Sequence, residues 1–265
     1  MNCLGLIGGI GWESTALYYR LINETVRSRF GSLYTARMLI NSLEFQSLDT
    51  LVKENRWNDA GAMLADAART LEAAGADGVL ICSNLMHYVA EHVEAAVDIP
   101  LLHLGDAVLK ELRAARVTRV GLLGTRFTLE HDFLLERPKD KPESGRPRRP
   151  ITVFQPHARD LDELDRIIYG EVCRGIARDS SRDTLLRIAG ELRAQGAQAI
   201  VLGSSELGLL LKPDDFNEPI FDSTEVHALA AAKWLIDSKP LAKPAAATSA
   251  AAAAKPAAAP GGRRG

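Results

Sequence analysis

Several features that would place a chain in a specialised class are missing from this sequence. No apolar run reaches about 18 residues, so a membrane span is not expected. The first residues lack the basic flank and cleavage site of a secretory signal, which makes the cytoplasm the expected location. The three cysteines (Cys3, Cys82 and Cys173) are an odd number without CxxC spacing. This pattern argues against a disulfide framework and a zinc site, so no metal is expected.

What the chain does contain is a repeating order of strand-like and helix-like segments. Its 265 residues are 46% hydrophobic with a net charge of −2, as in a soluble globular protein. Apolar runs at 4–7, 36–40 and 78–82 read as buried strands. Helices are expected at about 13–29, 45–55, 57–74 and 105–115, with a further one ending near 97. The alternation predicts an α/β fold with mainly parallel sheets.

The second half of the chain repeats the pattern of the first. Residues 117–125 resemble residues 2–9, and residues 196–204 resemble residues 75–83, at offsets of about 116 and 121. An internal duplication explains both matches. It predicts two similar lobes related by a pseudo-two-fold axis, with a cleft between them.

These observations predict a domain organisation. The first lobe is expected to cover 1–116, with the C-terminal helix possibly crossing over to it, and the second to cover 117–225, followed by a closing helix at 226–237. Residues 137–150 combine four prolines with dense charge, which predicts a mobile surface loop. This loop is basic but has no interleaved aromatic residues, so no nucleic acid is expected as a partner. The Ala/Pro/Lys-rich segment 238–265 is expected to be a disordered tail.

Two short segments concentrate the polar side chains that suggest chemistry. Residues 79–87 and 199–207 are each an apolar run that ends in hydroxyl or thiol groups, as expected of a strand that delivers reactive groups to a loop. Two similar lobes would place one group on either side of a small substrate. This arrangement suits a reaction in which a proton leaves one face of a carbon and returns to the other. Backbone N–H groups where the loops open helices would hold carboxylates.

Five motifs together resemble the aspartate/glutamate racemase family. They are Gly8–Thr15, Tyr18–Asn23, Cys82–His87, Leu123–Thr128 and Gly203–Leu207, and the resemblance spans about residues 1–236. It implies paired α/β lobes around an interlobe cleft, a homodimer, a small amino-acid or dicarboxylate ligand, and racemisation of a small acidic amino acid without a cofactor. In this family two cysteines act as opposed bases.

The resemblance places serine at both base positions. The first position precedes Asn84 and holds Ser83, and the second follows Gly203 and holds Ser204. A thiol has a pKa of about 8.5 and can be tuned to a thiolate, whereas a serine hydroxyl needs a partner base. The neighbouring Cys82 is either a substitute base or a buried structural thiol.

The family motifs also suggest substrate-binding residues. Gly9, Asn84 and Ser205 match positions that bind the substrate, with loop capping as the alternative for the last two. Thr125 and Thr128 could begin a helix, bind the ligand, or do both.

Other residues near the motifs have structural as well as chemical interpretations. Glu206 could bind substrate or relay protons, or it could favour a helix N-terminus. His87 is either a proton relay or a satisfied structural residue, and Arg126 pairs either with a substrate carboxylate or with surface acids. Asp222 and His227 match a family segment that we interpret as structural.

One rival motif and two rival functions remain. Residues 9–14 nearly match the GxGxxG dinucleotide fingerprint, but the third glycine is Ser14, Trp12 lies inside the loop, and no acidic residue lies near position 40. The sequence therefore favours an isomerase without a cofactor over a nicotinamide enzyme. A lyase or decarboxylase reaction in the same cleft and a silent amino-acid-binding protein are the alternatives.

Overall fold

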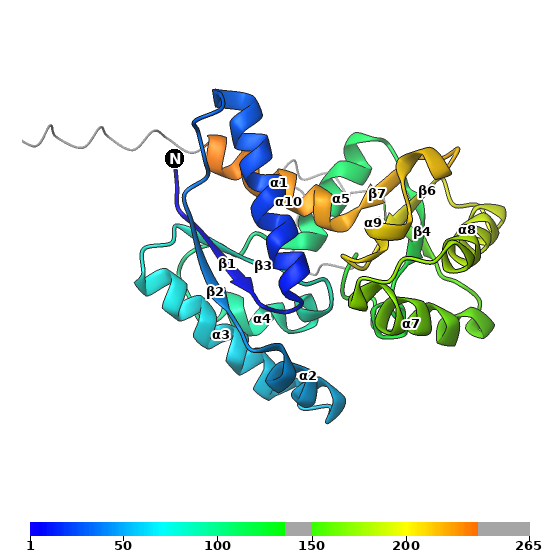
Figure 1. Ribbon diagram of the computed structural model, residues 1–265, viewed down its shortest axis with the longest axis horizontal. Helices are drawn as coiled ribbons and strands as arrows, with labels where there is room; N and C mark the ends of the chain where they lie inside the picture. Colours follow the sequence, from blue (N-terminus) through cyan, green and yellow to red (C-terminus); the bar gives the residue numbers. More distant parts are fainter. Residues whose placement is uncertain (136–149, 238–265) are drawn as a thin grey trace, which may run out of the picture.

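The computed structural model describes residues 1–135 and 150–237, which form two α/β lobes (Figure 1). The first lobe contains a parallel sheet of order β2-β1-β3, and the second a parallel sheet of order β5-β4-β6-β7. The strands are β1 (Leu4–Gly8), β2 (Met38–Ser42), β3 (Gly78–Ile81), β4 (Arg119–Leu123), β5 (Thr152–Phe154), β6 (Ala199–Leu202) and β7 (Ile220–Asp222). The predicted α/β class with parallel sheets is confirmed. The predicted tail and all of the predicted loop except Pro150 lie outside the described residues.

Helices cover both sheets, and those of the first half lie close to the positions predicted from the sequence. They are α1 (Trp12–Phe30), α2 (Phe45–Lys53), α3 (Trp57–Ala73), α4 (Ala90–Glu94), α5 (Leu104–Ala114), α6 (Arg126–Glu130), α7 (Leu161–Gly170), α8 (Asp179–Ala194), α9 (Leu207–Leu210) and α10 (Ser223–Asp237). The helix expected to end near 97 is instead a 3₁₀-helix at Leu85–Val89 followed by α4. The closing helix begins three residues earlier than expected, at Ser223.

Three strands of the second sheet repeat the order and pairing of the first, and β7 is an additional strand beside β6. In the first, β1 lies between β2 and β3, and Leu4 pairs with Gly78. In the second, β4 lies between β5 and β6, and Val120 pairs with Ala199. The duplicated sequence therefore corresponds to a duplicated topology, with β3 and β6 in equivalent places.

Alternating side chains of the first sheet pack into two separate cores, one on each face of the sheet. Leu6 and Cys82 face a cluster that includes α1 and α10, whereas Ile7 and Ile81 face a cluster that includes α3 and α4. This alternation follows from the two-residue period of a strand, because neighbouring side chains point to opposite faces. The direction of Cys82 is fixed in this way by the strand that precedes it.

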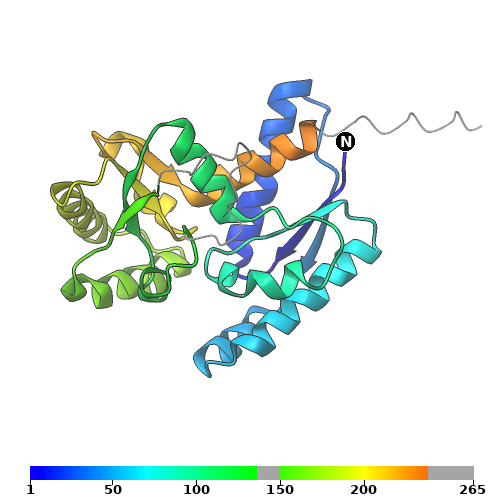
Figure 2. The same ribbon diagram turned by 180° about the vertical axis from the view of Figure 1, so that it is seen from behind.

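The last helix of each half packs with the other half. Helix α5 follows the first lobe, yet its Leu104, Val108 and Leu112 belong to the core of the second. Helix α10 follows the second lobe, yet its buried face joins the core of the first, next to α1. Both views show α10 running from the second lobe toward the first (Figures 1 and 2). The lobes are thus joined by two crossed helices, and each fully buried leucine on them contributes roughly 2 kcal/mol of burial.

Candidate active site

The two serines at the predicted base positions follow equivalent strands. Ser83 comes two residues after the end of β3, and Ser204 comes two residues after the end of β6. Both are buried, at 8% and 5% exposure. Because the carboxyl ends of parallel strands lie at one edge of a sheet, each serine stands on the loop edge of its own lobe.

The thiol of Cys82 lies in the core of the first lobe. The residue is fully buried, and its neighbours there include Tyr18 and Ile22 of α1. Burial raises the pKa of the Cys82 thiol, and a hydrogen bond with Thr15 lowers it only in part. A desolvated thiol of this kind is a poor source of thiolate, so the geometry favours the structural interpretation of this residue.

Asn84 links the loop after β3 to the start of α10. Its Nδ2 donates to Ser223 Oγ at 2.6 Å, and Ser223 Oγ donates to the backbone oxygen of Leu202 at 2.5 Å. Its Oδ1 is buried and has no hydrogen-bond partner among the described residues. An unpaired buried acceptor is costly, so this oxygen is suited to a donor supplied by a ligand.

The loop after β6 carries a network of hydroxyl and carboxylate groups. Ser204 Oγ donates to Glu206 Oε2 at 2.7 Å. Ser14 is the third residue of α1, and its Oγ lies 2.7 Å from Ser205 Oγ and 3.4 Å from Glu206 Oε1. The network therefore joins the two lobes. The sequence did not single out Ser14 as a site residue, because its partners lie 191 and 192 positions away along the chain.

The loop around Gly9 is held in a tight turn at the start of α1. Its φ of 78° is in the left-handed region, and a Cβ at this position would lie 2.1 Å from the backbone oxygen of Leu43. The Gly9 N–H donates to Thr15 Oγ1 at 2.9 Å. No side chain caps α1, whose N-cap is Gly11, so the N–H groups of its first turn are available to an anion.

Thr125 caps the short helix α6, as the sequence suggested. Its Oγ1 accepts from the Thr128 N–H at 3.3 Å and lies 3.0 Å from Thr128 Oγ1. Both threonines are buried. Tyr169 forms a hydrogen bond with Thr125, and burial raises the pKa of this tyrosine to about 12.

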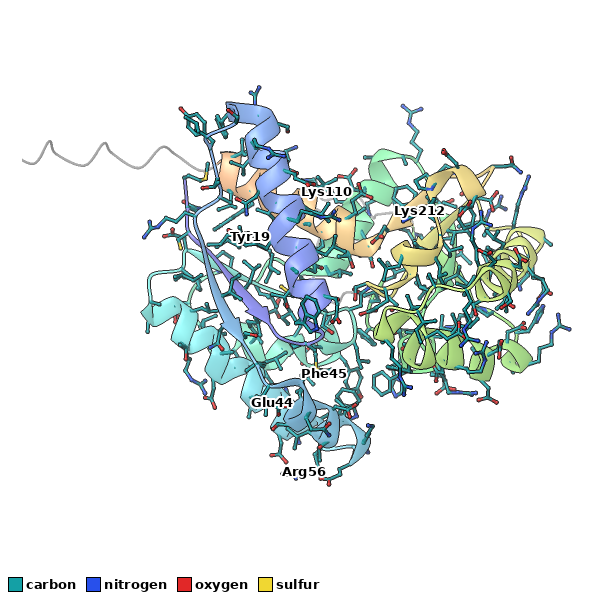
Figure 3. The ribbon with its side chains drawn as sticks, in the orientation of Figure 1. Tyr19, Glu44, Phe45, Arg56, Lys110 and Lys212 are labelled. Atoms are coloured by element: carbon teal, nitrogen blue, oxygen red, sulfur yellow. The ribbon has the colours of Figure 1, made fainter. Side chains whose placement is uncertain are left out.

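The cationic side chains are engaged elsewhere. Within 1–135 and 150–237, the hydrogen bonds and ion pairs link no lysine or arginine to Ser83 or Ser204. Arg126 binds two acidic side chains of the second lobe, and Lys212 donates to a backbone oxygen of α9 at 2.6 Å. Arg56 lies at the tip formed by α2 and α3, far along that lobe (Figure 3). The donors on or beside the two serine loops include hydroxyls, the Asn84 side-chain amide and the His87 N–H group.

Two histidines beside the site are held as neutral tautomers. His87 Nε2 accepts from the Leu104 N–H at 3.2 Å, so its Nδ1 carries the proton and donates to the backbone oxygen of Ser83 at 2.7 Å. His227 Nε2 lies 2.7 Å from the backbone oxygen of Leu102, and its Nδ1 lies 2.8 Å from the hydroxyl of Tyr18. Both imidazoles are buried, and both ring nitrogens of each form hydrogen bonds within the protein. This favours a structural role for both residues.

Aromatic side chains form a second link between the lobes. Trp57 and Tyr88 of the first lobe lie 4.5 Å and 5.0 Å, centroid to centroid, from Phe127 of the second. Phe127 also stacks on His131 at 3.9 Å. We refer to these four residues as the aromatic bridge. Sequence reasoning missed it, since only Phe127 lies in a recognised motif and its partners Trp57 and Tyr88 are far from it along the chain.

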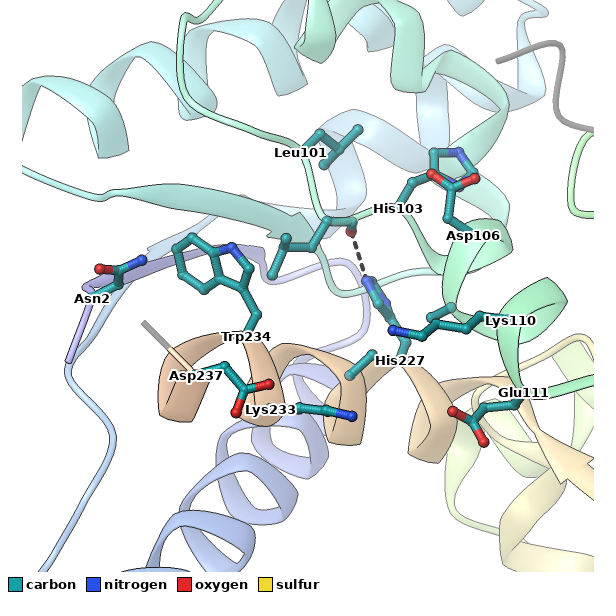
Figure 4. A pocket seen from close by; sticks show the side chains of 13 residues that line it. Asn2, Leu101, His103, Asp106, Lys110, Glu111, His227, Lys233, Trp234 and Asp237 are labelled. Carbon is teal, nitrogen blue, oxygen red and sulfur yellow. Dashed lines mark hydrogen bonds between the residues drawn. The ribbon is translucent and has the colours of Figure 1, made fainter. Parts of the chain in front are cut away.

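A pocket of about 560 Å³ lies between α5 and α10 (Figure 4). It is lined by His103 and Lys110 on one side and by His227, Lys233 and Trp234 on the other. None of the predicted site residues is part of its described lining. It is therefore a cavity of the crossed helices, separate from the two serine loops.

Metal-binding clusters and membrane-spanning helices are both absent from the described residues. These residues contain no group of three or more His, Cys, Asp or Glu side chains arranged to hold a metal ion. Among them, too, no helix is both long and apolar enough to cross a membrane.

Comparisons with known proteins agree with the fold and the motifs. The sequence profile of the Asp/Glu/Hydantoin racemase family matches residues 7–231. A structure from Yersinia pestis, described as a candidate Asp/Glu racemase, is 40% identical, covers 89% of this chain and 100% of its own, and superposes with a TM-score of 0.80. An aspartate racemase homologue from Pyrococcus horikoshii OT3 is 29% identical over 89% of this chain and 100% of its own, with a TM-score of 0.76. The chain belongs to the Asp/Glu/Hydantoin racemase family.

Proposed function

We propose that this protein removes and returns the Cα proton of a small amino acid between its two lobes, without a cofactor. An acidic amino acid is the favoured substrate, because the similar proteins are described as Asp/Glu and aspartate racemases. The observation that carries the proposal is the 2.7 Å hydrogen bond between Ser204 and Glu206. It gives one of the two serines a partner that can accept a proton.

A serine hydroxyl is too weakly acidic to ionise to an alkoxide, which would be the base, so a partner must accept its proton. In the forward step the Cα–H bond breaks and the proton bonds to Ser204 Oγ, while the proton of that hydroxyl passes to Glu206 Oε2. The electron pair stays on the substrate and is delocalised into its α-carboxylate. Ser83 then donates its hydroxyl proton to the opposite face of Cα. Solvent returns a proton to Ser83 and removes one from Glu206.

The same region offers groups that could hold the substrate. The unpaired Oδ1 of Asn84 is an acceptor suited to the α-ammonium group. The N–H groups of the loop from Gly9 into α1 are donors suited to a carboxylate. We assign Ser205, Thr125 and Thr128 to the remaining polar contacts, since all three are buried hydroxyls on the second-lobe loops.

An asymmetry between the two serines favours a second candidate. Among the described residues no carboxylate is hydrogen-bonded to Ser83, whereas Ser204 has Glu206. A site with one activated side suits a one-base reaction, such as a lyase or decarboxylase step, in which the carbanion is quenched from a single face. Under this candidate, the α-proton of one enantiomer exchanges without inversion.

Proton exchange in deuterated water separates these possibilities. The protein is incubated with L- and D-aspartate and L- and D-glutamate, the Cα–H signal is followed by NMR, and the enantiomers are separated by chiral chromatography. Racemisation with matching deuterium uptake supports the two-base reaction. Exchange of one enantiomer without inversion supports the one-base candidate.

Variants test the residue assignment. We expect Glu206→Gln to reduce exchange by about a hundredfold, because it removes the proton acceptor, while the exposed Glu225→Gln on α10 leaves it unchanged. Ser204→Cys combined with Ser83→Cys would install the thiols that the family uses. Ligand-induced thermal stabilisation of the wild type without exchange, and no exchange in the double variant, would refute catalysis and favour a silent binding protein.

We also propose that the protein is a homodimer, as the family resemblance implies. Large apolar side chains are exposed around α1 and the neighbouring edge of the first sheet, among them Trp12 at 70%, Tyr19 at 49% and Ile40 at 45%. Tyr19 lies on α1, where Figure 3 labels it. Light scattering should give twice the chain mass of 28.7 kDa. A mass equal to one chain at micromolar concentration would contradict this proposal.

A further inference from the structure

The geometry points to Ser14 as a positioning residue, which reaches from the first lobe and holds the Glu206 carboxylate against Ser204. This inference rests on the proposed function, because it concerns the same proton relay. It adds a residue from the opposite lobe to a relay that otherwise lies within one loop.

The position of Ser14 in its helix leaves its hydroxyl free for this role. Ser14 and Thr15 are adjacent in the first turn of α1, and both are buried. Thr15 stabilises its own lobe, since its Oγ1 accepts from the Gly9 N–H at 2.9 Å. The Ser14 hydroxyl makes its hydrogen bonds with Ser205 and Glu206 of the other lobe.

The contacts of Glu206 show what Ser14 contributes. Oε2 accepts from Ser204 at 2.7 Å, and Oε1 lies 3.4 Å from Ser14 Oγ. The carboxylate also lies close to Gly11, where a Cβ would be 3.9 Å from Oε1. The two oxygens are therefore held from the two lobes, so the carboxylate loses its second anchor if the lobes part.

The 2.7 Å contact with Ser205 supports the same role. A hydroxyl has one proton, so Ser14 donates to only one partner at a time. When Ser14 donates to Glu206, its oxygen can accept a hydrogen bond from Ser205. The chain of hydroxyls then ends on the carboxylate. In this partly buried chain each hydrogen bond polarises the next, which strengthens the chain relative to isolated pairs.

The test with substrate compares Ser14→Ala with Ser28→Ala. Ser28 is on the same helix but exposed, and its hydroxyl bonds its own helix at 2.8 Å. We expect Ser14→Ala to lower kcat for Cα exchange by about tenfold with little change in KM, and Ser28→Ala to change neither. In the Glu206→Gln background, Ser14→Ala should have no further effect. A full additional loss in that background would overturn the inference.

A second test needs no turnover, so it separates this inference from the proposed function. Ser204→Cys, made together with Cys173→Ser to remove the exposed thiol, places a sulfur next to Glu206. The held carboxylate accepts a hydrogen bond from the thiol, which stabilises the protonated form, and its negative charge disfavours the thiolate. Adding Ser14→Ala should therefore lower the midpoint pH of alkylation and raise the rate at pH 7 by at least about threefold.

The controls for this test are Ser28→Ala, which should leave the alkylation profile unchanged, and Glu206→Gln, which should produce the same acceleration as Ser14→Ala. If Glu206→Gln accelerates alkylation and Ser14→Ala does not, Ser14 does not position the carboxylate and the inference is wrong. If the wild type fails to exchange any substrate while Ser14→Ala shifts the alkylation profile, the proposed function fails but the positioning role of Ser14 stands.

Discussion

The buried imidazole of His227 should make the protein less stable in mild acid. Its Nε2 donates to the backbone oxygen of Leu102 and its Nδ1 accepts from the Tyr18 hydroxyl. These two hydrogen bonds stabilise the neutral imidazole in the folded state. Burial lowers the pKa of His227 from 6.5 to about 4. A lowered pKa means that the unfolded state takes up the proton first. The contribution of His227 to the free energy of unfolding is therefore fully present above pH 6.5 and is lost as the pH falls to 4. At about 1.36 kcal/mol per pKa unit, the loss is roughly 3 kcal/mol.

Asp222, five residues earlier, works in the opposite direction. Burial raises the pKa of this carboxyl from 3.8 to about 6, although its side chain also accepts from the Thr224 and Glu225 N–H groups. A raised pKa means that the folded state takes up the proton first, so this contribution is present below pH 3.8 and lost as the pH rises through 6. Because the carboxyl is partly exposed, we discount its effect to about 1 to 2 kcal/mol.

Single substitutions should separate the two contributions. Urea unfolding at pH 7 and pH 4 gives the change in free energy of unfolding for each protein. Relative to the wild type, His227→Gln should lose about 3 kcal/mol less stability on acidification, and Asp222→Asn, which keeps a good N-cap, should lose about 1 to 2 kcal/mol more. The exposed His157→Gln serves as the control. Equal pH dependence in wild type and His227→Gln would refute the reasoning.

Three further predictions concern packing. Gly9→Ala should cost more than about 2 kcal/mol, because its Cβ would lie 2.1 Å from a backbone oxygen. Gly175→Ala, which is left-handed but meets no atom within 4 Å, should cost only the left-handed strain of about 1 kcal/mol; urea titrations would measure both. The thiol of Cys82 should resist iodoacetamide until the protein unfolds, and rapid labelling in the native state would contradict its burial. Phe127→Ala in the aromatic bridge should lower the free energy of unfolding by about 1 to 2 kcal/mol, against little change for the exposed Phe45→Ala.

Strands β1 to β4 and β6 and the helices of the first half could be predicted because their signals are local, whereas β5 and β7, each three residues long, were not predicted. The apolar run before Ser83 and the one before Ser204 each define a strand and its end within a few residues. The repeat offset then predicts that the two ends are equivalent, and the pairing of Leu4 with Gly78 and of Val120 with Ala199 agrees with that. Side-chain alternation also indicates that Cys82 and Ser83 point in different directions.

The contacts between the lobes could not be predicted in this way. Ser14 and Ser205 are 191 positions apart, and neither has a spacing that indicates the other. Helix α5 has an apolar face that fits either sheet, so its amphipathic pattern does not tell which lobe it covers. The choice is made by tertiary packing, which places Leu112 in the second lobe.

The crossed helices constrain how a substrate could enter between the lobes. Moving α5 with the first half of the chain and α10 with the second would pull Leu112 and Leu235, both fully buried, out of the cores in which they pack, at roughly 2 kcal/mol for each. The hydrogen bonds of Ser14 are weaker, at about 1 kcal/mol net for an ordinary pair. An opening motion therefore breaks the Ser14 contacts first and leaves the crossed helices packed. Under the proposed positioning role of Ser14, that motion also removes the second anchor of Glu206, so we expect the proton acceptor to be in place only while the lobes are closed, as they are in this structure.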